Sequence, residues 1–184
     1  MYFNAEKIYC ANAGDCRAVL YTDGKAVALS EDHKPTDEKE LKRIEKVSWV
    51  CEDTGRVRGE IGVSRSIGDH KYKIFEEKDW KNQSIIAFPD VMVLDRTPQD
   101  QYFLLACDGI WDCMSNDEVG ERMNEEMSKL KEWMPKSNAI GNLMDQLICP
   151  KLEKGVKSGT DNMTCMIVYF KHDVKEKTGG CNIF

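Results

Sequence analysis

The sequence lacks long apolar runs, paired cysteines and clustered histidines, and each absence excludes a class of protein. No stretch approaches the roughly 18 apolar residues that a membrane-spanning helix needs, and the first residues show no signal-peptide pattern. The eight cysteines include no CxxC pair, and His33, His70 and His172 lack the spacing of a zinc site. No GxxxxGK phosphate loop is present. We therefore expect reduced thiols in a cytoplasmic or nuclear protein.

The composition is that of an acidic globular domain. Lysine and arginine number 26 against 32 acidic residues, so the formal charge is −6, which gives no support for nucleic-acid binding. With 184 residues, of which 41% are hydrophobic, the chain is long enough to bury a sizeable core as one domain.

Local patterns predict several strands near the N-terminal end and one near the C-terminal end. Residues 8–13 form the first apolar run, and Asp23-Gly24 separates two more, which predicts a hairpin over 17–29. Two short strands are expected over 49–63, and a final strand over 163–170.

Two capping boxes predict the starts of helices. Asp37 and Glu40 have the three-residue spacing of a capping box, and so do Ser115 and Glu118. Helices are therefore expected over 38–47, from 116 onward with an apolar face reaching Met134, and over 138–153. This order of elements favours an α+β fold with antiparallel sheets.

Aspartates stand at the ends of apolar strands that lie far apart in the sequence. Asp108 and Asp112 follow one apolar run with Gly109 between them, Asp161 precedes the last run, and Asp15 follows the first. A carboxylate beside an apolar strand is costly to ionise unless it is paired, hydrogen-bonded or bound to a metal. Magnesium and manganese prefer such oxygens. The alternative for each acid is a turn residue or helix cap, and Cys107 is expected to be a core thiol.

Five segments match motifs of a known enzyme family and occur in the same order as in that family. They are Ala11–Ala18, Glu31–Pro35, Val63–Asp69, Ala106–Asp112 and Gly159–Met163. In them the chain resembles the metal-dependent protein phosphatases, the protein phosphatase 2C class of Ser/Thr phosphatases. The resemblance identifies residues 1–170 as the C-terminal part of the catalytic domain and 171–184 as a polar tail.

The resemblance implies a fold and a metal centre. The fold would be an antiparallel β-sandwich flanked by helices in αββα layers, incomplete because the N-terminal part of the domain is absent. By motif, Asp108 and Asp161 would be ligands of a binuclear magnesium or manganese centre, whose water attacks phosphoserine or phosphothreonine. Asp15, Asp108 and Asp112 would form a weaker third site. Arg65 is expected in an internal ion pair, without a catalytic role.

The departures from the family decide what the chain alone can do. A glutamate–aspartate pair, an Asp-Gly-His-Gly segment and a phosphate-binding arginine of the family do not occur here. The isolated chain is therefore expected to be inactive or weakly active, with exposed sheet edges and apolar faces. It is interpreted first as a fragment or incomplete gene model of an active phosphatase. The alternatives are half of an enzyme completed by another chain, and a catalytically inactive phosphatase-like module for binding or regulation.

The expected partners are proteins that carry phosphoserine or phosphothreonine. Cys181-Asn-Ile-Phe184 fits a C-terminal prenylation box, so contact with a membrane is expected only if Cys181 is lipidated.

Overall fold

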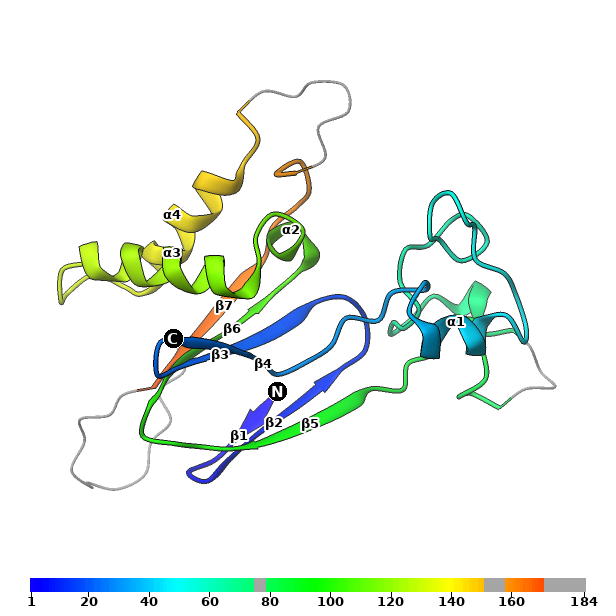
Figure 1. Cartoon of the computed structure of the whole chain (residues 1–184), viewed down its shortest axis with the longest axis horizontal. Helices are drawn as coiled ribbons and strands as arrows, with labels where there is room; N and C mark the ends of the chain where they lie inside the picture. Colours follow the sequence, from blue (N-terminus) through cyan, green and yellow to red (C-terminus); the bar gives the residue numbers. More distant parts are fainter. Residues whose placement is uncertain (75–78, 151–157, 171–184) are drawn as a thin grey trace. The chain divides into compact units, whose positions relative to one another are not determined.

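The computed structural model describes residues 1–74, 79–150 and 158–170. Its elements are, in chain order, β1 (Tyr2–Phe3), β2 (Lys7–Asn12), β3 (Arg17–Thr22), β4 (Lys25–Ala28), α1 (Glu38–Ile44), the 3-10 helix η1 (His70–Tyr72), β5 (Asp90–Asp95), β6 (Asp100–Ala106), α2 (Asp108–Trp111), α3 (Asn116–Lys129), α4 (Ser137–Leu147) and β7 (Cys165–Tyr169) (Figure 1). Within these described residues, no helix is long and apolar enough to cross a membrane.

The strands form two antiparallel sheets. One has the order β1-β2-β5 and the other β4-β3-β6-β7. The expected α+β class is therefore confirmed. The chain divides into two compact units, the first made of 1–2, 9–16 and 30–93, the second of 3–8, 17–29 and 94 onward.

In the second unit, β3 and β4 form the expected hairpin. Asp23 and Gly24 both have positive φ, 48° and 71°, as a type I′ turn requires. The register pairs Thr22 with Lys25 directly across this turn. Asp-Gly at this position therefore predicted both the turn and the register.

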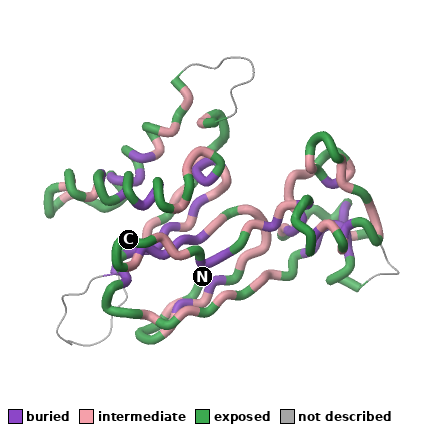
Figure 2. Tube along the Cα trace, viewed as in Figure 1, coloured by how far each residue is buried: buried purple, intermediate pink, exposed green. Residues whose placement is uncertain are grey.

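Helices α3 and α4 cover one face of the four-stranded sheet (Figure 1). Their buried residues join the sheet in one apolar core (Figure 2), built from Val19 and Tyr21 of β3, Tyr102 and Leu104 of β6, Val119 and Met123 of α3, and Ile140 and Leu143 of α4. Helix α3 begins with the expected capping box, because Ser115 Oγ accepts from the Glu118 amide and the Glu118 carboxylate accepts from the Ser115 amide.

Both helices are shorter than their apolar periodicity predicts. Helix α3 ends at Lys129, before Met134, and α4 ends at Leu147 instead of near residue 153. The expected end of α4 was wrong because the backbone leaves the helix to bond the segment at Gly159, after the residues where the helix was expected to end. The Cys149 amide donates to the carbonyl of Gly159 at 2.9 Å, a bond that helical spacing cannot reveal.

The expected exposed apolar residues are present on two strands. Val91 and Val93 of β5 are exposed, as are Met166 and Tyr169 of β7. In the first unit, the two strands expected over 49–63 are reduced to isolated bridges of Val57. Positive φ angles at residues 55, 58 and 59 turn the chain too tightly for longer extended segments.

The capping box expected at Asp37 and Glu40 was wrong. The Asp37 side chain caps no amide of α1 and instead accepts from the Lys34 amide at 2.8 Å. Glu40 points into the first unit, where it accepts from Arg65 and Arg43, each at 2.6 Å. Glu40 therefore forms an ion pair with a buried arginine elsewhere in the chain and does not cap the helix terminus.

Arg65 forms the internal ion pair that we expected. Its side chain is 2% exposed, and it donates to Glu40, to Asp90 at 2.9 Å and to the Phe88 carbonyl at 2.9 Å. Burial opposes ionisation of the Glu40 carboxyl, but hydrogen bonds from Arg65, Ser64 and Arg43 outweigh it and lower its pKa to about 2. Glu40 is therefore ionised in the folded chain and holds Arg65 in place.

We predict that Glu40→Gln destabilises the chain by about 3–5 kcal/mol at pH 7, because Arg65 then keeps only part of its countercharge. The pKa of Glu40 is lowered on folding. Its contribution to stability is thus complete above the ordinary pKa near 4.5 and is lost as the pH falls toward 2. Urea unfolding at pH 7, 4.5 and 3 measures both effects.

Glu38→Gln is the matched control, since Glu38 lies on the same helix with its side chain 82% exposed. It should change stability by less than about 0.5 kcal/mol. An equal loss in the two variants would contradict a special role for Glu40.

Candidate metal centre

Asp108 lies where β6 passes into helix α2. The strand ends at Ala106, extended Cys107 follows, and the helix begins at Asp108. The indole of Trp111 donates to the Ala106 carbonyl at 2.9 Å, and Ile110 is fully buried in the core. These contacts fix the turn, which leaves Asp108 half-buried at the end of a central strand.

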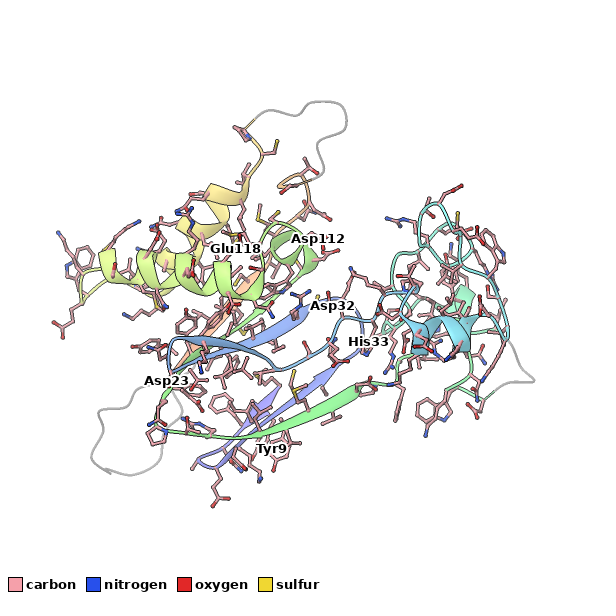
Figure 3. The ribbon with its side chains drawn as sticks, in the orientation of Figure 1. Tyr9, Asp23, Asp32, His33, Asp112 and Glu118 are labelled. Atoms are coloured by element: carbon pink, nitrogen blue, oxygen red, sulfur yellow. The ribbon has the colours of Figure 1, made fainter. Side chains whose placement is uncertain are left out.

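Asp112 closes the same turn. Its amide donates to the Asp108 carbonyl at 2.7 Å, and its side chain is exposed at the C-terminal end of α2 (Figure 3). The helix therefore holds the two acids one turn apart, as their spacing in the sequence predicts.

Asp161 is brought to this turn by β7. Strand β7 pairs with β6 as far as Ala106 and Cys165, and the Cys107 amide extends the ladder to the Thr164 carbonyl at 3.1 Å. The preceding segment lies against α2, so closely that a Cβ on Gly109 would lie 2.4 Å from the Asn162 carbonyl oxygen. The backbone next to Asp161 thus contacts the residue next to Asp108.

The Asp161 side chain is exposed, and one of its oxygens accepts from the Asn162 amide at 2.7 Å. This bond orients the carboxylate while the other oxygen stays outside it. The pairing of β6 with β7 and the contact at Gly109 therefore bring together the segments that carry Asp108 and Asp161.

Asp15 belongs to the first compact unit. Its side chain is 16% exposed and accepts from the Lys34 ammonium at 2.6 Å. The neighbouring Gly14 amide donates to Nδ1 of buried His33 (labelled in Figure 3) at 3.2 Å. His33 Nε2 lies 3.3 Å from a carboxylate oxygen of Asp90. His33 is thus a buried side chain within the hydrogen-bond network of the first unit.

The ligand assignments of Asp15, Asp108, Asp112 and Asp161 stay predictions. Across the part of the chain that the structure describes, no three His, Cys, Asp or Glu side chains are grouped as a metal site. The third site, which would join Asp15 to Asp108 and Asp112, takes residues from both compact units.

Sequence reasoning missed the hydrogen bonds that two thiols beside these acids make. Cys107 is half-buried rather than a core residue, and both Cys107 and Cys113 hydrogen-bond the backbone of the Asp161 segment. The one signal was the position of each cysteine, immediately outside the Asp108–Asp112 turn.

Comparison with known proteins identifies the family. The family model described as protein phosphatase 2C matches residues 1–156. The chain belongs to the protein phosphatase 2C family. Asp161 follows the matched residues, in the segment that contacts Gly109.

Curated relatives of this phosphatase family extend well beyond the present chain. It is 41% identical over 169 residues to the probable protein phosphatase CG10417 of Drosophila melanogaster, covering 92% of this chain and 25% of that protein. It is 40% identical over 169 residues to human protein phosphatase 1G, covering 90% of this chain and 31% of the relative. The chain thus spans about a quarter to a third of these relatives.

Solved phosphatase structures share the fold. A phosphatase from a pathogenic strain of Toxoplasma gondii has a TM-score of 0.75 and 31% identity over 93% of this chain and 50% of its own. A serine-threonine phosphatase 2C from the same organism has a TM-score of 0.64 and 25% identity, over 92% and 56% respectively. The predicted family and fold class are both confirmed.

We predict that Gly109→Ala displaces the Asp161 segment. Its Cβ would lie 2.4 Å from the Asn162 carbonyl oxygen, so the backbone must shift at a cost of about 1–3 kcal/mol. Urea unfolding measures the cost, and amide NMR shifts of residues 161–164 report the displacement.

Gly141→Ala is the control, because Gly141 is also helical but has nothing within 4 Å of its added Cβ. Alanine there should be neutral or stabilise the chain by up to about 1 kcal/mol. Similar behaviour of the two variants would show that the contact at Gly109 does not constrain the segment.

Proposed function

We propose that the chain forms the C-terminal part of a metal-dependent protein serine/threonine phosphatase, which hydrolyses phosphoserine and phosphothreonine. Membership of the protein phosphatase 2C family supports the reaction class. The single structural observation that carries the proposal is the contact between Gly109 and Asn162, because it places the segments of Asp108 and Asp161 side by side.

The donor chemistry fits a hard divalent cation. Asp108 and Asp161 offer carboxylate oxygens from two separate backbone segments, and the Asp161 side chain is exposed to solvent. When bound, magnesium or manganese would supply an activated water and neutralise charge on the phosphoryl oxygens. Asp108 and Asp161 would hold the catalytic ions, and Asp15 and Asp112 would join Asp108 in holding a third.

The chain's own contribution is to position these acids. β6 and β7 fix the two segments by backbone hydrogen bonds, and Ile110 and Trp111 anchor the intervening helix in the core. A site built on paired strands holds its ligands more rigidly than one built on loops. The glutamate–aspartate pair and the phosphate-binding arginine of the family would have to come from residues outside this sequence.

We therefore propose that these 184 residues alone are inactive or weakly active, and that an N-terminal half completes the centre on the same or another polypeptide. The proposed partners are proteins carrying phosphoserine or phosphothreonine in the cytoplasm or nucleus. The prenylation signal at Cys181 lies outside the residues that the structure describes.

We predict that the chain with Mn²⁺ releases phosphate from a phosphothreonine peptide at close to the background rate. Adding the separately expressed N-terminal half of a relative's catalytic domain should raise the rate at least tenfold, because it supplies the remaining ligands. Asp108→Ala should then return the rate to close to the background. Free phosphate is measured against peptide concentration.

Asp95→Ala is the matched control, since Asp95 is an exposed strand residue paired with Lys7. It should leave the restored rate unchanged. Strong release by the chain alone, lost in Asp108→Ala, would contradict the need for completion. Phosphopeptide binding without hydrolysis in the combined sample would favour a catalytically inactive binding module.

A further inference from the structure

Two cysteines bracket the turn that carries Asp108 and Asp112. Cys107 precedes Asp108, and Cys113 follows Asp112. Both are free and half-buried, and their sulfur atoms contact the segment 159–164, in which Asp161 lies. The contacts of each thiol define how this segment is held.

Cys113 joins the start of the segment to helix α2. Its thiol donates to the Gly109 carbonyl at 3.2 Å and accepts from the Gly159 amide at 3.2 Å. The sulfur therefore bridges α2 and the backbone two residues before Asp161.

Cys107 holds the end of the segment. Its thiol donates to the Asn162 carbonyl at 3.3 Å and accepts from the Thr164 amide at 3.2 Å. These bonds lie on the C-terminal side of Asp161, opposite the one that Cys113 makes. Asp161 is thus flanked by backbone groups that two thiols hydrogen-bond.

The backbone leaves the segment little freedom to find other partners. Gly159 has a φ of +72°, and a Cβ there would lie 2.0 Å from the Leu147 carbonyl oxygen. The Cys149 amide also donates to the Gly159 carbonyl. With one end fixed at α4 and the middle against Gly109, loss of a thiol bond cannot be repaired by a simple shift of the chain.

We propose that Cys107 and Cys113 are positioning residues whose thiols hold the 159–164 segment against α2 and so keep Asp161 beside Asp108 for a divalent cation. The role in cation binding rests on the proposed function. The attachment of the segment is a property of the chain without metal, so it can be measured separately.

The first test is amide hydrogen exchange in the metal-free chain. Cys113→Ala should speed exchange at Gly159, and Cys107→Ala should speed it at Thr164, each about fivefold, because each amide loses its acceptor. Cys107→Ser and Cys113→Ser keep a donor and an acceptor and should restore most of the protection. Unchanged exchange in both alanine variants would overturn the proposal.

Cys51→Ala is the matched control. Cys51 lies in the other compact unit, where hydrogen bonds from Thr54 lower the pKa of its thiol. Removing it tests whether loss of any accessible thiol disturbs the segment, and exchange at Gly159 and Thr164 should not change. If an alanine variant fails to fold, Cys113→Val keeps the apolar bulk, removes the hydrogen bonds and should give the same increase at Gly159.

The second test is Mn²⁺ affinity, with Asp161→Asn as the reference for loss of the ligand. Titration of Mn²⁺ alone, followed by water-proton relaxation, should show severalfold weaker binding in Cys107→Ala and Cys113→Ala and recovery in the serine variants. Normal affinity in the alanine variants with weakened binding in Asp161→Asn would overturn this inference alone. Normal affinity in Asp161→Asn as well would instead contradict the proposed assignment of Asp161 as a ligand.

Discussion

The backbone of Asn162 lies against Gly109, and the position of the candidate metal centre depends on this contact. Glycine is required there because any side chain would collide with the Asn162 carbonyl oxygen. The approach follows from the pairing of β6 with β7, whose last pair, Ala106 with Cys165, lies two residues before Asp108 and four residues after Asp161. Two acids 53 residues apart in the sequence thus come from adjacent strand ends, and the distance between their segments is set by backbone packing.

The contact positions Asp108 because α2 itself is anchored in the core. Ile110 is buried in the core beneath α3 and α4, and the Trp111 indole bonds the last residue of β6. Arg17 of β3 lies over the Trp111 ring and donates to Asn116 at the start of α3. Contacts from the apolar core, from the end of β6 and from the start of α3 therefore all hold the four-residue helix α2. This places the acids on a rigid support.

Local patterns predicted the elements whose causes are local. Asp23-Gly24 fixed its hairpin, and Ser115 with Glu118 began α3, because each needs only residues a few positions apart. Glu40 has the same spacing from its cap position, yet it pairs with Arg65, 25 residues away, because an unpaired buried arginine costs more than an uncapped helix. The end of α4 and the contact of the Cys113 thiol with the 159–164 segment depend on Gly159, which no periodicity connects to them.

The acids that stabilise the fold and the candidate ligands Asp112 and Asp161 have different surroundings. In the first unit, arginines contact Glu40 and Asp90 and lower the pKa of each carboxyl. Both carboxylates are therefore held in ion pairs that stabilise the fold. In the second unit, the side chains of Asp112 and Asp161 are exposed to solvent. The Asp112 amide bonds the Asp108 carbonyl, and the Asp161 segment is held by backbone contacts and by the Cys107 and Cys113 thiols. An acid held by its backbone while its side chain faces solvent can accept a cation without breaking an ion pair, which favours Asp161 over the buried acids as a ligand.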